Sequence, residues 1–151
     1  MHRENAALAA LTALALLASI GAGAAAVEGA TNAHGLAIVH NPLAGDAAAI
    51  AEGEALFAEK ACSGCHGSAG AGGMCPSLVN AAWTYGNDDT TLFNLIRLGS
   101  AGLRAHGYVR SGEETIVADM PPLGSVVSDE EAWQLIAWIR SRYAGAPTQQ
   151  P

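Results

Sequence analysis

The residues best suited to chemistry lie together in one short stretch, Cys62-Ser63-Gly64-Cys65-His66. Two thiols three positions apart can each form a thioether bond with one of two vinyl groups on the same macrocycle. The histidine that follows can then place a ring nitrogen against the bound metal. This C-x-x-C-H pattern is typical of c-type haem attachment. The sequence therefore predicts one covalently bound haem c, held by Cys62 and Cys65, with His66 as an iron ligand.

The same pair of cysteines has two other uses in proteins. A thiol–disulfide oxidoreductase also carries C-x-x-C, but its site needs a preceding strand in a βαβ context, which the pattern does not provide. A structural zinc site would need a second ligand pair at matching spacing, and only Cys75 and scattered histidines remain. Haem attachment is therefore the favoured interpretation.

A second candidate iron ligand follows much later, at Met120-Pro121-Pro122. A thioether sulfur is a soft, neutral ligand that favours reduced iron, so His/Met ligation raises the reduction potential. The prolines stiffen the segment and limit how far the sulfur can drift. The alternatives are His106, which lacks the proline setting, and Met74, which follows His66 by only eight residues. We expect Met120 to be the ligand.

Further side chains are expected around the haem. Trp83 and Tyr85 can pack against it, and the Trp83 N–H or the Tyr85 O–H can donate to a buried propionate. Arg97, and Arg104 beyond it, could neutralise propionates, although at least one of the two is expected to be solvated. Cys75 is left over, and we interpret it as a buried thiol near the haem. A disulfide-linked dimer or a reactive thiol is the alternative for this cysteine.

The first of three predicted helices spans 46–61 and ends directly before the haem motif. Asp46 can cap its start, and apolar residues recur at helical spacing. Gly53 lies among them, and a glycine inside a helix costs about 1 kcal/mol relative to alanine. Its usual justification is the close approach of another helix, and Phe57, one turn later, would pack beside that crossing.

The other two predicted helices flank a long segment that contains glycine and proline. Asp88 or Asp89 can cap a helix that runs to Leu98, with Gly99 as its stop. Residues 99–125 are predicted to form a loop, and loops of this length are usually functional. A capping box at 128–131 begins the last helix, which runs to about Tyr143 and would cross the first helix at Gly53.

In combination these motifs resemble the class I c-type cytochromes over roughly residues 46–143. The resemblance rests on Gly53-x-x-x-Phe57 before the haem motif, on Met120 with its prolines, and on Leu135-x-x-Trp138-Ile139 near the end. It implies an all-α cytochrome c fold in which the N- and C-terminal helices cross and loops wrap one covalently bound haem. It also implies that the carbonyl of Pro76 accepts a hydrogen bond from the outer ring nitrogen of His66, which would fix the imidazole.

A haem with two protein ligands has no open position for a substrate, so a single-electron carrier is expected and not an enzyme. Trp83-Thr84-Tyr85, the Leu-Phe helix and the glycine-rich loop are similar to the cytochrome c-L group, which accepts electrons from quinoprotein (PQQ-dependent) methanol or ethanol dehydrogenases. The resemblance implies such a donor, with a downstream cytochrome or oxidase as acceptor. The alternatives are a general respiratory cytochrome that feeds a terminal oxidase and, if Met120 does not ligate, a five-coordinate haem sensor or enzyme.

The start of the chain looks like an export signal. Arg3 lies in a short polar head, an apolar run follows at 6–20, and small residues up to 26 offer cleavage sites. We expect a signal peptide at 1–26, an N-terminal arm at 27–45, a monohaem cytochrome c domain at 46–145 and a disordered tail at 146–151, in a periplasmic protein. An uncleaved membrane anchor is the alternative.

The charge of the predicted mature part limits its partners. Six basic and thirteen acidic side chains remain after residue 26, so the formal charge is −7. An acidic protein of this kind will not bind nucleic acid through phosphate contacts. We expect a monomer that docks onto neutral or basic surfaces of redox proteins, with steering that weakens as salt increases.

Overall fold

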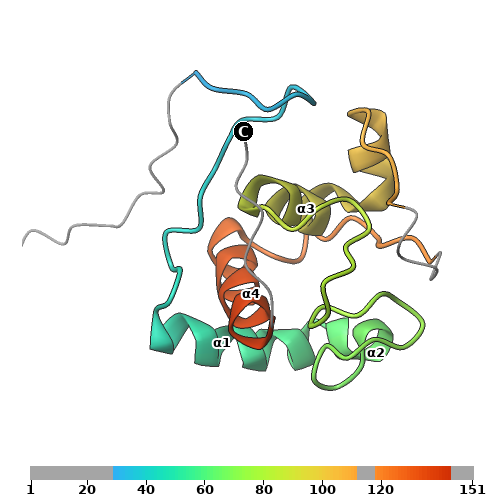
Figure 1. The fold of residues 1–151 in the computed structure, drawn as a ribbon. Coiled ribbons are helices and arrows are strands. Elements are labelled where there is room, and N and C mark those ends of the chain that lie inside the picture. The colour runs from blue at the N-terminus through green and yellow to red at the C-terminus, as the bar shows by residue number, and fades with distance from the viewer. Residues whose placement is uncertain (1–28, 112–117, 144–151) are drawn as a thin grey trace, which may run out of the picture.

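The computed structural model describes residues 29–111 and 118–143, so the predicted signal peptide and the predicted tail lie outside the described residues. Within these ranges the chain forms four helices and, besides them, one isolated bridge between Thr31 and Ala37 (Figure 1). The helices are α1 (Ala47–Glu59), α2 (Cys62–His66), α3 (Asp89–Ala105) and α4 (Asp129–Arg142). The prediction of an all-α fold is confirmed. No helix in the described ranges is both long and apolar enough to span a membrane.

Side-chain caps set where three of the helices begin. Asp46 accepts from the Ala49 N–H at 2.8 Å before α1, and Asp88 accepts from the Thr91 N–H at 2.8 Å before α3. Ser128 begins α4 with a full capping box, because its hydroxyl accepts from the Glu131 N–H while the Glu131 carboxylate accepts from the Ser128 N–H. Each cap satisfies backbone donors that a helix start leaves without an internal partner.

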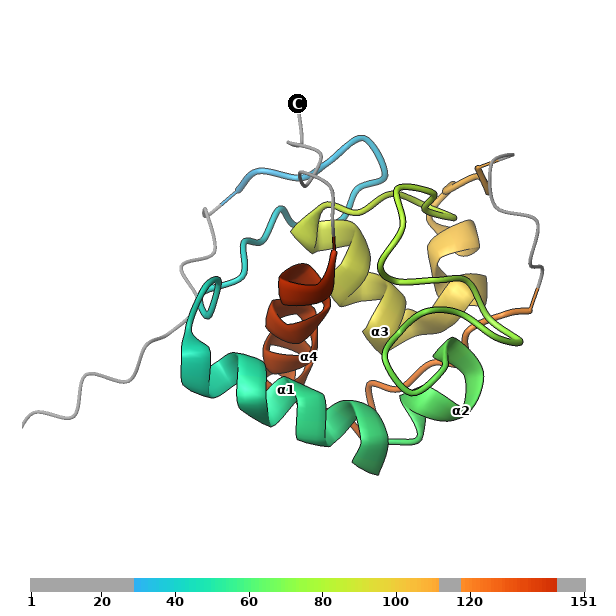
Figure 2. The same cartoon turned by 60° about the horizontal axis from the view of Figure 1, so that its bottom comes forward.

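α1 and α4 cross at close range, as Figures 1 and 2 both show. A Cβ atom placed on Gly53 would lie 2.7 Å from the carbonyl carbon of Gln134 and 2.8 Å from the Cβ of Trp138. Phe57 packs beside this contact, with its ring centroid 4.3 Å from that of Trp138. The missing side chain at position 53 therefore lets the two backbones touch, as the sequence predicts.

The main hydrophobic core lies where α1, α3 and α4 meet. α4 supplies most of it, and α1 and α3 each close one side. Its buried members are Leu56, Phe57, Leu92, Ile96, Val127, Ala132, Trp133, Leu135, Ile136, Trp138 and Ile139. This core fixes α1, and with it the haem motif that follows, against the rest of the domain.

α3 is longer than the sequence predicts. Gly99 does interrupt it, with φ 69° and ψ 178°, but helical backbone resumes afterwards and continues to Ala105. The prediction of a loop from 99 was therefore wrong over this second segment. The segment is held by burial, because Leu103 is completely buried in a second cluster with Leu36 and Tyr108. Leu36 comes from the N-terminal arm, so the sequence pattern of α3 alone does not contain this signal.

The described part of the arm, 29–45, passes along α3 toward the start of α1 (Figure 1). Val39 N–H donates to the Thr90 hydroxyl at 2.9 Å, and Asn41 N–H donates to the Asp89 carboxylate at 2.8 Å. The Asn41 side chain also donates to the carbonyl of Trp133 at 3.0 Å. The arm thereby ties the beginning of α3 to α4.

Candidate haem site

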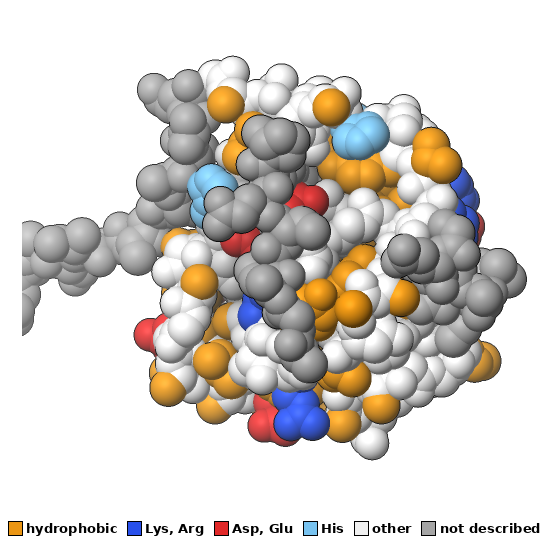
Figure 3. Space-filling model, in the orientation of Figure 1, with side chains coloured by type: hydrophobic (Ala, Val, Ile, Leu, Met, Phe, Trp, Pro, Cys, Tyr) orange, Lys and Arg blue, Asp and Glu red, His pale blue; other side chains and the backbone are white. Residues whose placement is uncertain are grey.

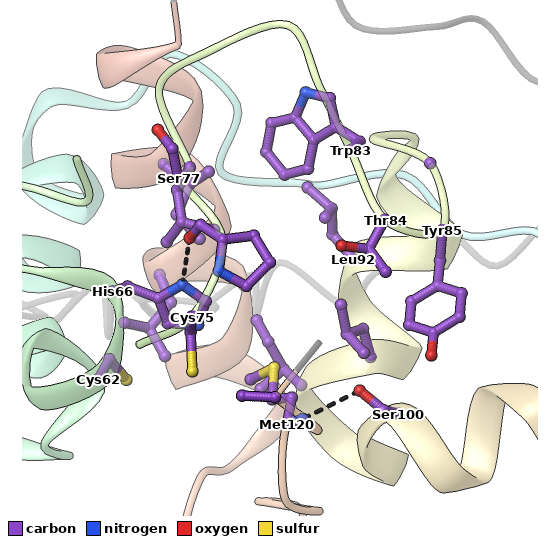
Figure 4. Close-up of a pocket in the computed structure, with 18 of the residues that line it drawn as sticks. Cys62, His66, Cys75, Ser77, Trp83, Thr84, Tyr85, Leu92, Ser100 and Met120 are labelled. Atoms are coloured by element: carbon purple, nitrogen blue, oxygen red, sulfur yellow. Dashed lines mark hydrogen bonds between the residues drawn. The ribbon is translucent and has the colours of Figure 1, made fainter. Parts of the chain in front are cut away.

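An apolar cavity opens between α2, the segment that follows it, α3 and the loop at Met120 (Figure 4). About 900 Å³ of space lies between its lining atoms, including the part that opens to solvent. Six of the predicted site residues line it: Cys62, His66, Pro76, Trp83, Tyr85 and Met120. On the face of the molecule shown in Figure 3, hydrophobic side chains are more frequent than charged ones.

The haem motif occupies the short helix α2. The backbone turns sharply just before it, because Ala61 adopts φ 60° and is the one non-glycine residue with positive φ in the described ranges. Such a conformation is uncommon for alanine and nothing in the local sequence predicts it. Cys62 lines the cavity, and burial raises the pKa of its thiol. Cys65 is half-buried and does not line the cavity.

The imidazole of His66 has a fixed orientation. Its Nδ1 lies 2.8 Å from the carbonyl oxygen of Pro76, and a carbonyl only accepts, so the proton is on Nδ1. Burial lowers the pKa of His66, while the bond to Pro76 acts in the opposite direction. The neutral ring therefore keeps its lone pair on Nε2, which is the form that binds a metal.

Cys75 takes part in the turn that brings Pro76 to His66. The Cys75 N–H donates to the carbonyl of Cys65 at 3.1 Å, which ties the turn to α2. The Cys75 side chain is only 5% exposed, and burial together with the neighbouring Cys65 thiol raises its pKa to about 11. Of its two interpretations, the buried thiol agrees with this placement.

The structure brings Met120 to the cavity and leaves both alternative ligands outside it. Met74 is 69% exposed. His106 is exposed at the end of α3, where its Nδ1 faces the carbonyl of His34 at 3.4 Å. Neither residue lines the cavity, whereas His66 and Met120 both do. These two side chains come from segments far apart in the chain, as the close-up shows (Figure 4).

Trp83 presents an unusual polar group. Its indole Nε1 is buried and has no hydrogen-bond partner among the described residues. An unpaired buried donor costs about 1–3 kcal/mol, so such groups normally have an acceptor. Trp83 lines the cavity, and a haem propionate is an acceptor of the right kind for its N–H.

The predicted arginines have different positions. Arg97 does not line the cavity, because its guanidinium pairs with Asp129 and lies 5.6 Å from the centre of the Phe93 ring. Arg104 instead reaches the cavity wall at Tyr85, where its Nη1 donates to the phenol oxygen at 3.1 Å. The sequence also gives no reason to single out Arg110, which lines the cavity.

The residues present fit a covalently attached haem. The cavity is lined by the Cys62 thiol, by a histidine with a free ring lone pair, by a thioether and by apolar walls. Cys65 follows Cys62 by three positions, and the lining residue Trp83 has a buried N–H without an acceptor. This fold and this set of donors define a c-type cytochrome domain of class I, with haem c as its cofactor.

The chain belongs to the cytochrome family described as cytochrome c oxidase, cbb3-type, subunit III, whose model matches residues 48–139. It is 34% identical over 102 residues to cytochrome c-L of Methylorubrum extorquens, which is 66% of this chain and 43% of that protein. It is 31% identical over 103 residues to the cbb3-type oxidase subunit FixP of Sinorhizobium medicae, 67% of this chain and 32% of that one. The chain thus spans less than half the length of these curated relatives.

A solved structure shares the fold. The crystal structure of cytochrome cL from the methylotroph Methylophaga aminisulfidivorans matches with a TM-score of 0.52 and 33% identity, over 69% of this chain and 61% of that one. The predicted cytochrome c fold is therefore confirmed.

Proposed function

We propose that this protein carries single electrons through a haem c whose iron is ligated by His66 and Met120. The observation that carries the proposal is that these two residues, and neither His106 nor Met74, line one apolar cavity together with Cys62. When bound, a haem with two protein ligands exchanges one electron and offers no position for a substrate. The His66 Nε2 lone pair and the Met120 sulfur supply the two ligands.

The other cavity residues hold and tune the group. Cys62 and Cys65 attach it covalently. The Pro76 carbonyl keeps the His66 ring in one orientation and increases its basicity. The Trp83 N–H would be a donor for a propionate, and the apolar walls would keep water from the iron, which would favour the less charged, reduced state.

We further propose that the electron donor is a PQQ-dependent alcohol dehydrogenase that oxidises methanol or ethanol, with a downstream cytochrome or oxidase as acceptor. Two findings support this choice: the similarity to cytochrome c-L and the cytochrome cL crystal structure that shares the fold. The proposed location is the periplasm, where the export signal predicted at 1–26 would send the chain.

A second candidate function is the direct transfer of electrons to a terminal oxidase. The family description and the similarity to FixP, a subunit of a cbb3-type oxidase, favour it. In that case the domain would pass electrons to the oxidase, and an alcohol dehydrogenase would not be its specific donor.

Stopped-flow kinetics separate the two candidates. The oxidised haem-bound protein is mixed with a quinoprotein methanol or ethanol dehydrogenase and its alcohol, and reduction is followed in the visible spectrum. Our proposal predicts fast reduction with a rate that saturates as the dehydrogenase concentration rises.

The matched reaction mixes the reduced protein with a cbb3-type oxidase. Fast oxidation there, with no reduction by the dehydrogenases, would contradict the proposed donor and favour the second candidate. Reduction by ascorbate serves as the control for a competent haem.

A further inference from the structure

The break in α3 is the place where the Met120 loop is attached. In an unbroken helix the carbonyls of Ile96 and Arg97 would accept from the N–H groups four residues later. Here they accept from the loop, with Leu123 N–H at 2.9 Å and Gly124 N–H at 3.1 Å. The helix has therefore exchanged internal hydrogen bonds for bonds to the segment that carries the proposed ligand.

Gly99 makes this attachment possible. A Cβ atom there would lie 2.6 Å from the carbonyl oxygen of Met120 and 2.7 Å from the nitrogen of Pro122. Real Cβ contacts are not this short, and the φ of 69° at this position is also unfavourable for a residue with a side chain. The glycine therefore allows the backbone of the loop to rest directly on the backbone of the kink.

Ser100 holds both backbone polar groups of Met120. Its N–H donates to the Met120 carbonyl at 2.9 Å, and its hydroxyl accepts from the Met120 N–H at 2.9 Å. The serine is 3% exposed and lines the cavity. Since Pro121 and Pro122 have no N–H, every backbone donor from 120 to 124 apart from these prolines is bonded to α3.

A second contact holds the loop from further along the same segment of α3. Arg104 donates to both carboxylate oxygens of Asp119, the residue before Met120, at 2.7 Å each. Both side chains are exposed, and exposed ion pairs contribute little because water screens them. The buried pair of bonds from Ser100 is therefore the stronger of the two attachments.

We infer that Ser100 is a positioning residue for Met120. Its two hydrogen bonds hold the backbone of the methionine on the kinked α3, and this would keep the sulfur in place as a ligand of the iron. This inference rests on the proposed His66/Met120 ligation. It predicts that loss of the Ser100 hydroxyl makes the methionine easier to displace, although Ser100 itself does not touch the iron.

Ser100→Ala tests the inference in the haem-bound, oxidised protein. Imidazole is titrated as a competing ligand, and loss of the methionine–iron charge-transfer band is followed at the red end of the spectrum. We expect imidazole to bind roughly tenfold more tightly to the variant, because the Met120 N–H loses its buried acceptor. Ser100→Thr keeps a hydroxyl and should restore an affinity near that of the wild type.

Ser128→Ala is the matched control, since it removes a serine hydroxyl that also accepts from a backbone N–H, at the start of α4. It should lower the unfolding midpoint and leave imidazole affinity unchanged. Equal imidazole affinities in S100A and the wild type, or an equal increase in S100A and S128A, would overturn the inference. A wild-type protein without the methionine band would overturn the proposed ligation as well, so the two failures are distinguishable.

Amide hydrogen exchange of the wild type gives a second measurement that does not depend on how S100A folds. The N–H groups of Met120, Leu123 and Gly124 should exchange slowly and with similar rates, because α3 holds all three. Exchange of these amides at the rate of an unstructured loop would overturn the inference.

Discussion

The orientation of the two proposed ligands depends on hydrogen-bonding groups that are distant from them in the sequence. The Pro76 carbonyl lies ten residues after His66 and decides which ring nitrogen keeps the lone pair. Ser100 lies twenty residues before Met120 and binds both of its backbone groups. Pro76 is part of the resemblance to class I cytochromes, whereas Ser100 has no local pattern that distinguishes it from any other serine.

Trp83→Phe removes the buried N–H and keeps an aromatic ring in the cavity wall. Since a donor disperses the negative charge of a propionate near the iron, its loss should stabilise the oxidised state. We expect the midpoint potential to fall by about 20–60 mV, which corresponds to one hydrogen bond of ordinary strength for a one-electron couple. Redox titration of both proteins measures the change.

Trp133→Phe is the control for this variant, because Trp133 is a core tryptophan that does not line the cavity. It should lower stability and leave the potential unchanged. A midpoint potential in W83F equal to that of the wild type would show that the indole N–H does not donate a hydrogen bond to a haem propionate.

The crossing of α1 and α4 is the element that positions the haem motif. The crossing depends on backbone contact at Gly53. Near one end of α1, Glu131 links the two helices through its carboxylate group. One carboxylate oxygen of Glu131 accepts from the Ser128 N–H at 2.7 Å in the capping box. The other pairs with Lys60, directly after α1, at 2.9 Å.

Gly53→Ala should separate these helices. The added methyl group would meet the backbone of Gln134 and the Cβ of Trp138, neither of which can move aside as a flexible side chain can. We expect a loss of about 2–4 kcal/mol in the free energy of unfolding, at or above the usual cost of overpacking. Urea denaturation measures it. Gly64→Ala, where an added Cβ meets nothing within 4 Å, is the matched control. A similar loss in both variants would argue against a specific contact at Gly53.

Glu131→Gln should alter how stability depends on pH. The pKa of Glu131 is lowered from 4.5, first by the bond from the Ser128 N–H and then by Lys60. A lowered folded-state pKa means that the stabilisation is complete above the unfolded-state value and is lost as pH falls through the folded-state value. The wild type should therefore be more stable than E131Q at pH 7, and the difference should shrink on acidification below about 4.5.

Thermal unfolding of both proteins from pH 7 to pH 3 measures this difference. Glu130→Gln changes the charge in the same helical turn without the contacts to Ser128 and Lys60, so it serves as the control. A stability difference between the wild type and E131Q that stays constant over the range would contradict the assignment.

At the scale of the whole molecule, local patterns predict the helix starts, the Gly53 crossing and the cavity residues near the haem motif. They fail where long-range packing decides. The second segment of α3 exists because Leu103 is buried against Leu36 of the arm. Arg97 and Arg104 are seven residues apart and would share a face of an unbroken helix. The break at Gly99 instead gives them different partners, Asp129 and Asp119.

The central claim is that one haem is covalently attached and ligated by His66 and Met120. Intact-mass spectrometry of the purified protein, together with its oxidised and reduced visible spectra, tests this claim most directly. We predict the added mass of one haem, a low-spin spectrum and a methionine–iron band in the oxidised form. An unmodified mass would contradict the claim and leave Cys62 and Cys65 as redox thiols. A haem without the methionine band would contradict Met120 as the ligand.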